Sequence, residues 1–172
     1  MNVADPNNLK LKKLVELIGC SEPVETKVVA TNPEYRIGKC WFNAYHAALG
    51  ELENVVHGWL FWEINGSIIG QHHAVVREKR QHTKMLDVTP NAGDHESVLF
   101  AESVDHKFDF ERLKGWVSVL CDDENQISVK QLDINGDIIN EGYERIGKTS
   151  LNPGQKELTE VRKLCGIAGS KS

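Results

Sequence analysis

Residues 59–76 read WLFWEINGSIIGQHHAVV, and this stretch decides the fold that the sequence predicts. Asn65-Gly66 divides it into two apolar runs, and an Asn-Gly pair supplies both positive-φ residues of a type I′ turn. Such a turn joins two neighbouring antiparallel strands. We therefore predict a β-hairpin with residues 59–64 as its first strand and the chain from Ser67 onward as its second.

The second strand of this hairpin is expected to continue beyond the turn. It runs through His72-His73-Ala74-Val75-Val76 into the charged residues 77–80, which we interpret as the tip of a second hairpin. The chain then returns as residues 85–89 before Pro90, which cannot donate a ladder hydrogen bond. The sequence thus predicts a three-stranded antiparallel meander. Further strands are predicted at residues 97–100, 115–121, 127–134 and 137–140.

Two helices are predicted before the hairpin. Leu11, Leu14 and Ile18 repeat at helical spacing, so residues 8–18 should form an amphipathic helix that ends at Gly19. After a loop, residues 40–49 are rich in alanine and aromatic residues and predict a short, mostly buried helix. A terminal helix is expected from Asn152 onward. The fold class that follows is α+β, with N-terminal helices packed on an antiparallel β-sheet.

Composition limits the classes of protein to which the chain can belong. Its 172 residues, 40% of them hydrophobic, suit one substantial core, so we expect a single domain over residues 1–172. The net charge of −5 argues against a nucleic-acid partner, because such proteins concentrate basic residues on one face. No apolar run is long enough to cross a bilayer. We therefore expect a cytoplasmic protein with neither nucleic acid nor membrane as a partner.

Cys40 is the first candidate for chemistry. The four cysteines of the chain lack close pairing, so reduced thiols are expected. Cys40 follows Gly38 by two residues and falls in the first turn of the second predicted helix. A helix N-terminus stabilises a thiolate, and an adjacent imidazolium does so as well. A histidine must therefore come from elsewhere in the fold if Cys40 is a nucleophile.

His73 and Asp87 are the candidates to complete the site. If the second hairpin is regular and centred near Arg80, the two residues face each other across adjacent strands. Directly opposed residues have Cβ atoms roughly 4.5–5.5 Å apart and point to the same face. The sequence thus predicts a hydrogen bond between Asp87 and His73, with Cys40 as the nucleophile, His73 as general base and acid, and Asp87 as the orienting carboxylate.

The order of these motifs resembles the papain-like superfamily in its transglutaminase-like arrangement. The matching segments are Gly38-Lys39-Cys40, Val56-His57-Gly58-Trp59, His73-Ala74-Val75 and Leu86-Asp87-Val88-Thr89-Pro90. They also look like a group of uncharacterised bacterial and phage proteins. The resemblance spans about residues 32–101 and leaves the C-terminal strands and helix, residues 102–172, without a match. It implies a papain-like α+β fold and a Cys-His-Asp core.

The chain departs from that family at two points. Val75 stands where an aromatic residue is usual after His-Ala, and the upstream glutamine of a papain-type oxyanion hole has no clear match. The backbone N–H of Cys40 can supply one oxyanion donor, with Asn32, Asn43 or Gln71 as candidates for the second. Asn43 and Gln71, together with Trp59, are also the predicted substrate-binding residues.

The predicted activity is cleavage or transfer at an amide or peptide bond through a thioester on Cys40. A peptide, a protein or a small amide would be the substrate, without a cofactor. The alternative is a non-catalytic papain-like binding or interaction module in which Cys40 is a buried thiol. Zinc bound by Cys40, His72, His73 and Asp87 is disfavoured, because adjacent strand residues point to opposite faces. The prediction is therefore of no metal site.

Overall fold

A computed structural model describes residues 1–78 and 81–110 and five short strands beyond them, with side chains for residues 1–78 and 83–110. The helices are α1 (Leu9–Ile18), α2 (Cys40–Ala47) and the 3-10 helix η1 (Leu52–Asn54). The first six strands are β1 (Asn2–Val3), β2 (Val24–Val28), β3 (Val55–Ile64), β4 (Ser67–Glu78), β5 (Gln81–Asp87) and β6 (Ser97–Glu102). The later strands are β7 (Lys114–Trp116), β8 (Val119–Cys121), β9 (Ile127–Leu132), β10 (Ile138–Tyr143) and β11 (Lys148–Ser150).

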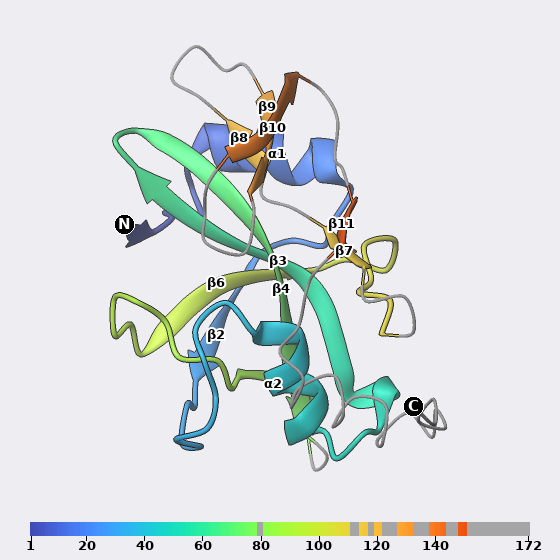
Figure 1. The fold of residues 1–172 in the computed structure, drawn as a ribbon. Coiled ribbons are helices and arrows are strands. Elements are labelled where there is room, and N and C mark those ends of the chain that lie inside the picture. The colour runs from blue at the N-terminus through green and yellow to red at the C-terminus, as the bar shows by residue number, and fades with distance from the viewer. Residues whose placement is uncertain are drawn as a thin grey trace, which may run out of the picture.

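Five of these strands close into a barrel. They pair in the order β3-β6-β2-β5-β4, and β4 pairs again with β3 to complete the ring (Figure 1). The mixed α+β class is therefore confirmed, but the sheet closes into a barrel and is not purely antiparallel, as the sequence predicted it to be. One of its pairs, β2 with β5, is parallel. Closure into a ring removes the free edges that an open sheet of these strands would present.

Strand β2 is the barrel strand that the sequence prediction missed. Its residues 24–28 fall in the segment that we predicted to be a loop. Charged Glu25 and Lys27 alternate with Thr26, so the segment lacks the apolar run that marks a buried strand. Only Thr26 among these five is buried. Strand β2 closes the barrel because it lies between β5 and β6, and that pairing joins segments far apart in the sequence.

The central hairpin is confirmed and is longer than predicted. β3 and β4 pair antiparallel from Ile64 opposite Ser67 back to Val55 opposite Val76. Asn65 and Gly66 have φ angles of 50° and 78°, as a type I′ turn requires. Figure 1 shows the pair as the long bent ribbon around which the other elements are arranged.

The register of the next hairpin differs from the prediction. Val76 pairs with Leu86 and Arg77 with Met85, and the register shifts before Glu78. Continued along the strands, this register places Asp87 opposite Val75, not opposite His73 as we predicted. The displacement is two residues, and an even displacement keeps a side chain on the same face of the sheet. Asp87 and His73 therefore still share a face, although they are not directly opposed.

Both predicted N-terminal helices are present, and both pack on β4. The Asn8 side chain caps α1 by accepting a hydrogen bond from the Lys10 N–H at 2.9 Å, and α1 ends at Gly19 with φ 71°. Leu11, Leu14 and Ile18 of α1 pack against the outer face of the barrel. Helix α2 ends two residues earlier than predicted and lies towards the other end of the β3–β4 hairpin (Figure 1).

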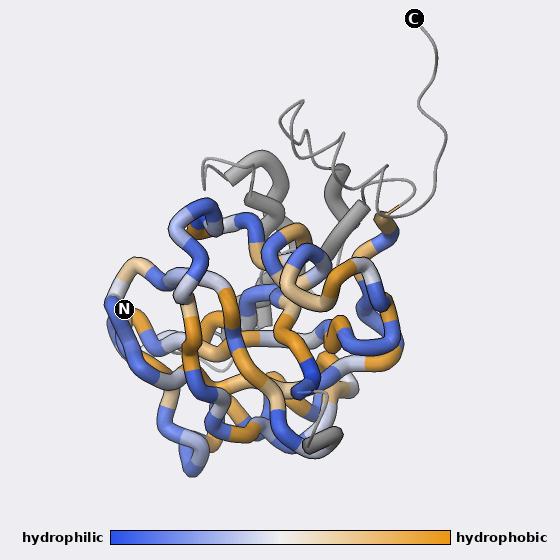
Figure 2. Tube along the Cα trace, turned by 90° about the horizontal axis from the view of Figure 1, so that it is seen from below, coloured by the Kyte–Doolittle hydropathy of each residue, from blue (hydrophilic) through white to orange (hydrophobic). Residues whose placement is uncertain are grey.

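The interior of the barrel is a closed apolar core to which each of its five strands contributes. Figure 2 shows hydrophobic positions concentrated along the strands and hydrophilic ones in the connecting loops. The buried members are Val56, Leu60, Trp62, Val75, Val98 and Phe100, with Val28, Ile69 and Met85 partly buried against them. His73 lies two residues from Val75 and Asp87 two residues from Met85, so both face the same interior.

The later strands agree in part with the sequence prediction. The predicted strand at residues 115–121 is divided into β7 and β8, and β9 pairs antiparallel with β10 as a hairpin would. β8 extends the sheet beside the first residues of β4. The Asn135-Gly136 turn and the predicted terminal helix lie outside the described residues.

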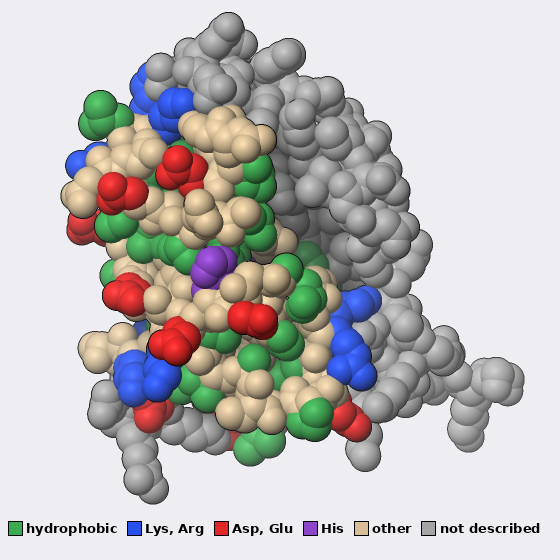
Figure 3. All heavy atoms as spheres, turned by 90° about the vertical axis from the view of Figure 1, so that its left-hand side faces the viewer, with side chains coloured by type: hydrophobic (Ala, Val, Ile, Leu, Met, Phe, Trp, Pro, Cys, Tyr) green, Lys and Arg blue, Asp and Glu red, His purple; other side chains and the backbone are tan. Residues whose placement is uncertain are grey.

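Two surface features bear on the expected partners. Among the described residues, no helix has the length and apolar character needed to span a bilayer. On the face in Figure 3, the coloured charged side chains are scattered and the basic ones do not merge into one patch.

A substitution at Gly58 tests how closely the strands of the barrel wall pack. It pairs with His73 of β4 and Glu102 of β6, and a Cβ atom there would overlap the Ala101 carbonyl oxygen and the Phe100 ring. We expect Gly58→Ala to lower the free energy of unfolding by about 1–3 kcal/mol, because overpacking shifts the backbone. Urea unfolding measures it.

Gly70→Ala is the matched control for this substitution. A Cβ atom at residue 70 would lie 3.3 Å from Cε1 of Phe61, a side chain that can adjust. The control should therefore lose less stability than Gly58→Ala. Equal unfolding midpoints for the two variants would contradict the close approach of β3 and β6.

Candidate active site

The candidate site lies where β4 changes its neighbour. β4 pairs with β8 over residues 68–70 and with β5 over residues 76–78. Among the described residues, the segment between them, 71–75, pairs only with β3. The start of α2 meets β4 at this gap, where the Cys40 Sγ lies 4.0 Å from the His72 carbonyl oxygen. The N-terminus of α2 can therefore contact the middle of β4, because no second strand is paired there among the described residues.

The three residues predicted for catalysis meet at this gap. His73 donates a hydrogen bond from Nε2 to Asp87 Oδ1 at 3.0 Å. The Cys40 side chain interacts with the same imidazole and helps to raise its pKa. Because Nε2 faces the carboxylate, the sulfur is left with Nδ1. One ring thereby joins the thiol to the acid, which is the arrangement that activates a cysteine nucleophile.

Asp87 is itself held in place. Its Oδ1 also accepts a hydrogen bond from the Thr89 backbone N–H at 2.9 Å. An aspartate that bonds the N–H two residues later forms a tight local turn. This turn ends β5 at Asp87, two residues before the end that we predicted. The sequence Asp87-Val88-Thr89 is compatible with this turn, because the side chain of an Asp can accept a hydrogen bond from the backbone N–H two residues later.

The electrostatics favour a charged imidazole. Burial lowers the pKa of His73, but attraction to the Asp87 carboxylate and to Cys40 outweighs it and raises that pKa from 6.5 to about 10. His73 therefore carries its proton at neutral pH. The proton on His73 is then available to a leaving group.

All three side chains are strongly buried. The exposed fractions are 5% for Cys40, 5% for His73 and 1% for Asp87. The nearest exposed side chain on this face of β4 is Gln71, two residues before His73. Its Oε1 accepts a hydrogen bond from Trp62 Nε1 at 3.1 Å, which leaves the NH₂ group without a partner among the described residues.

The side chains of Asn43 and Asn32 form hydrogen bonds with residues of the loops around the site. The Asn43 NH₂ group donates to the Arg36 carbonyl oxygen at 2.9 Å and to Thr89 Oγ1 at 3.3 Å, so both of its hydrogens are used. It ties α2 to the turn that holds Asp87. Asn32 accepts from the Glu34 N–H at 2.9 Å within its own turn. The contacts of Asn43 disfavour that residue as a donor to a substrate.

Trp59 does not reach the site. Its side chain is 0% exposed and belongs to the apolar cluster beneath α1, on the outer face of β3. A fully enclosed side chain cannot touch a substrate, so we assign Trp59 to the core. The sequence could not separate this case from a cleft wall, because both place an aromatic residue on a strand.

His72 points to the other face of β4, as predicted from strand alternation. Its Nδ1 accepts from Trp41 Nε1 at 3.0 Å, and its Nε2 donates to the His106 carbonyl oxygen at 2.7 Å. Burial lowers the pKa of His72 well below its ordinary value. Because both ring nitrogens are engaged, His72 has none to offer a metal ion. Across residues 1–78 and 81–110, no three His, Cys, Asp or Glu residues are grouped to hold one.

No protein-family model, curated protein or solved structure matches the chain. The reading of the site therefore rests on its geometry and chemistry.

The pKa of His73 predicts a pH dependence of stability. A pKa raised on folding stabilises the protein fully below pH about 6.5, and this contribution is lost as pH rises through about 10. Asp87→Asn removes the largest of the attractions that raise the pKa. The stability difference between wild type and Asp87→Asn should therefore shrink between these pH values, as measured by urea unfolding.

Glu22→Gln, which removes an exposed carboxylate elsewhere, is the control and should show a constant difference from wild type. A pH-independent difference for Asp87→Asn would contradict the charged His73–Asp87 pair.

Proposed function

We propose that this protein is a cysteine-dependent hydrolase or acyl transferase acting on an amide or peptide bond. Cys40 is the nucleophile, His73 the general base and acid, and Asp87 the orienting carboxylate. The observation that carries the proposal is the His73 imidazole, which is hydrogen-bonded at 3.0 Å to Asp87 and whose pKa is also raised by the Cys40 side chain. A peptide, a protein or a small amide is the substrate.

The reaction follows from these positions. The Cys40 sulfur attacks the carbonyl carbon, and the C–S bond forms as the carbonyl π electrons move to oxygen. The tetrahedral adduct collapses, the C–N bond breaks, and the imidazolium of His73 gives its proton to the leaving amine. Neutral His73 then takes a proton from water or from an acceptor amine, which attacks the thioester and releases Cys40. Asp87 holds the imidazole so that Nδ1 faces the sulfur throughout.

Two donors are suited to the oxyanion. The N–H groups at the start of a helix have no partner within the helix, so the Cys40 N–H at the first position of α2 can supply one hydrogen bond. Gln71 is the better of the predicted side chains for the second. It is exposed, lies on the same face of β4 as His73, and keeps its NH₂ group available.

A papain-like relationship, with the transglutaminase-like order Cys, His, Asp, is part of the proposal. It is supported by a cysteine at the first residue of α2 and by the histidine and the acid on the neighbouring strands β4 and β5. It is also supported by the pattern of motifs over about residues 32–101. The fold differs from a simple packing of helices on a sheet in that five of its strands close into a barrel.

The burial of Cys40 favours a second candidate function. At 5% exposure, the thiol has the environment of a small apolar side chain, and it belongs to the cluster in which α2 packs on the barrel. A binding or interaction module would keep this packing without chemistry. The two functions differ in whether an electrophile reaches the sulfur.

Activity-based labelling tests the proposal. We expect electrophilic peptide and amide probes to modify wild type at Cys40, with no labelling of Cys40→Ser. Asp87→Asn should label about 10²–10⁴ times more slowly, because His73 loses its orienting partner. Mass spectrometry of the intact protein gives the rates. Labelling of wild type at a rate unchanged in Asp87→Asn would contradict the triad.

Cys20 provides an internal comparison for simple alkylation. Burial raises the pKa of its thiol to about 11, against the lowering effect of its backbone hydrogen bond. We expect iodoacetamide at about pH 6 to modify Cys40 well before Cys20, because Cys40 is the proposed nucleophile at a helix N-terminus and burial disfavours the Cys20 thiolate. His73→Ala should remove this preference, whereas Cys20→Ser should leave the labelling of Cys40 unchanged. An unreactive Cys40 in the folded protein would support the binding module.

A further inference from the structure

A hollow lies on the outer face of β3, away from the barrel interior. It is a cavity of about 450 Å³, which falls within the usual range for small-molecule sites. Leu52, Val55, Phe108 and Phe110 supply its apolar lining, and His57 and Lys107 are the polar groups that concern a ligand. The rings of Phe108 and Phe110 meet edge to face, with centroids 4.9 Å apart. This wall suits a flat apolar group.

His57 carries an unused hydrogen-bonding group beside this cavity. The residue is 8% exposed, and its Nε2 has no hydrogen-bond partner among the residues that the structure describes. Burial, aided by the nearby Lys107 charge, lowers the pKa of His57 to about 4, so the ring is neutral at neutral pH. A buried nitrogen without a partner is uncommon and calls for an explanation. A hydroxyl group suits it, because a hydroxyl both donates and accepts and so matches either tautomer of the ring.

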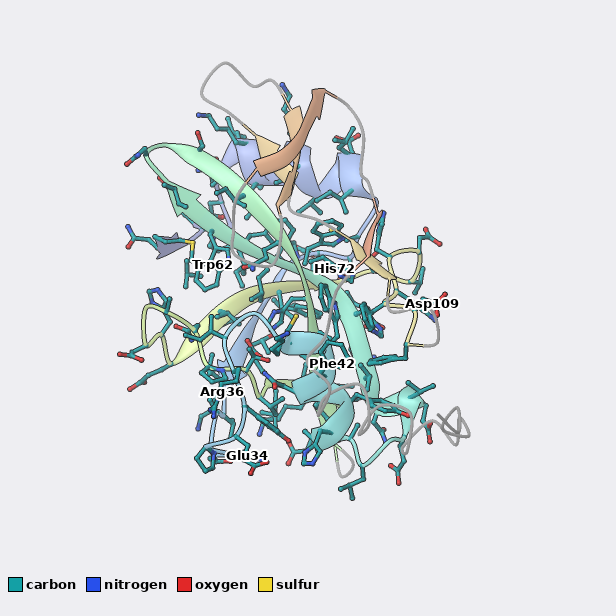
Figure 4. The ribbon with its side chains drawn as sticks, viewed as in Figure 1. Glu34, Arg36, Phe42, Trp62, His72 and Asp109 are labelled. Atoms are coloured by element: carbon teal, nitrogen blue, oxygen red, sulfur yellow. The ribbon has the colours of Figure 1, made fainter. Side chains whose placement is uncertain are left out.

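The charged groups of the cavity come from the segment that follows β6. Lys107 is exposed and lines the cavity, and the neighbouring Asp109, which also lines it, takes part in a further interaction. Figure 4 shows Asp109 on the outer side of the molecule and His72 further in. The positive charge available to a ligand is therefore that of Lys107, and a carboxylate is its natural complement.

From these three features we propose that the cavity binds a small aromatic carboxylate that carries a hydroxyl group on its ring. The ring lies against Phe108 and Phe110, the carboxylate pairs with Lys107, and the hydroxyl bonds to His57. An acid without the ring would leave the apolar wall uncovered, and an aromatic acid without the hydroxyl would leave His57 Nε2 unpaired. The ligand class is thus fixed by three separate contacts.

This cavity is distinct from the candidate active site. The ring of His72 lies between them, stacked on His57 with centroids 6.2 Å apart and bonded to Trp41. Trp41 in turn stacks on Phe108 at 4.7 Å and directly follows Cys40 in α2. The proposal therefore does not depend on the chemistry of Cys40, although one aromatic layer connects the two sites.

Titration calorimetry on the full chain tests the proposal with three probes. They are 4-hydroxyphenylacetate, phenylacetate, which lacks the hydroxyl, and 2-(4-hydroxyphenyl)ethanol, which lacks the carboxylate. We expect saturable binding of the first with one site per chain. Each of the others should bind about threefold to tenfold more weakly, which is the effect of one hydrogen bond or one ion pair. This comparison needs no mutant and is unaffected by folding defects.

Substitutions then test whether the ligand binds at the proposed position in the cavity. Lys107→Met should weaken 4-hydroxyphenylacetate about threefold to tenfold and leave 2-(4-hydroxyphenyl)ethanol unchanged, whereas Lys13→Met on the exposed face of α1 should change neither. Cys40→Ser should bind as wild type does, which keeps this result separate from the proposed enzymatic function. No saturable binding of 4-hydroxyphenylacetate, equal affinity for all three probes, or indifference to Lys107→Met would overturn the proposal.

Discussion

The hydrogen bond between His73 and Asp87 is the constraint on which the candidate site depends. It links two ionisable groups that are almost wholly removed from solvent, and such groups are tolerated only when each satisfies the other. The bond also fixes the imidazole, because its Nε2 is committed to the carboxylate and Nδ1 remains for Cys40. The charge, the orientation and the reach of the ring towards the sulfur all follow from this one contact.

Closure of the barrel makes that contact possible. β5 brings Asp87 beside β4, and β2 holds β5 in place through the parallel pairing of Val28 with Asp87. The Val29 N–H then donates to the Asp87 carbonyl oxygen at 2.6 Å, so the backbone of the acid is fixed from the β2 side. The candidate site is therefore built by elements that a local hairpin does not contain.

The two faces of β4 lie in different environments, the barrel interior on one side and an aromatic layer on the other. His73 looks into the barrel and gains a charge partner, whereas His72 looks outward into an aromatic layer and stays neutral. Two adjacent residues of the same type thus acquire opposite pKa shifts, because alternation along a strand sends them into different surroundings. The same outward layer separates the candidate active site from the cavity beside His57.

The sequence by itself determined the local structure: the type I′ turn at Asn65-Gly66, both N-terminal helices, and the face on which His73 lies. These depend on short-range periodicity and turn chemistry, which neighbouring residues encode. Tertiary structure alone decided the rest. It placed the charged segment of β2 in the barrel, shifted the β4–β5 register by two residues, and enclosed Trp59 beneath α1. Such outcomes depend on contacts between distant segments, and local sequence patterns do not specify which of those segments meet.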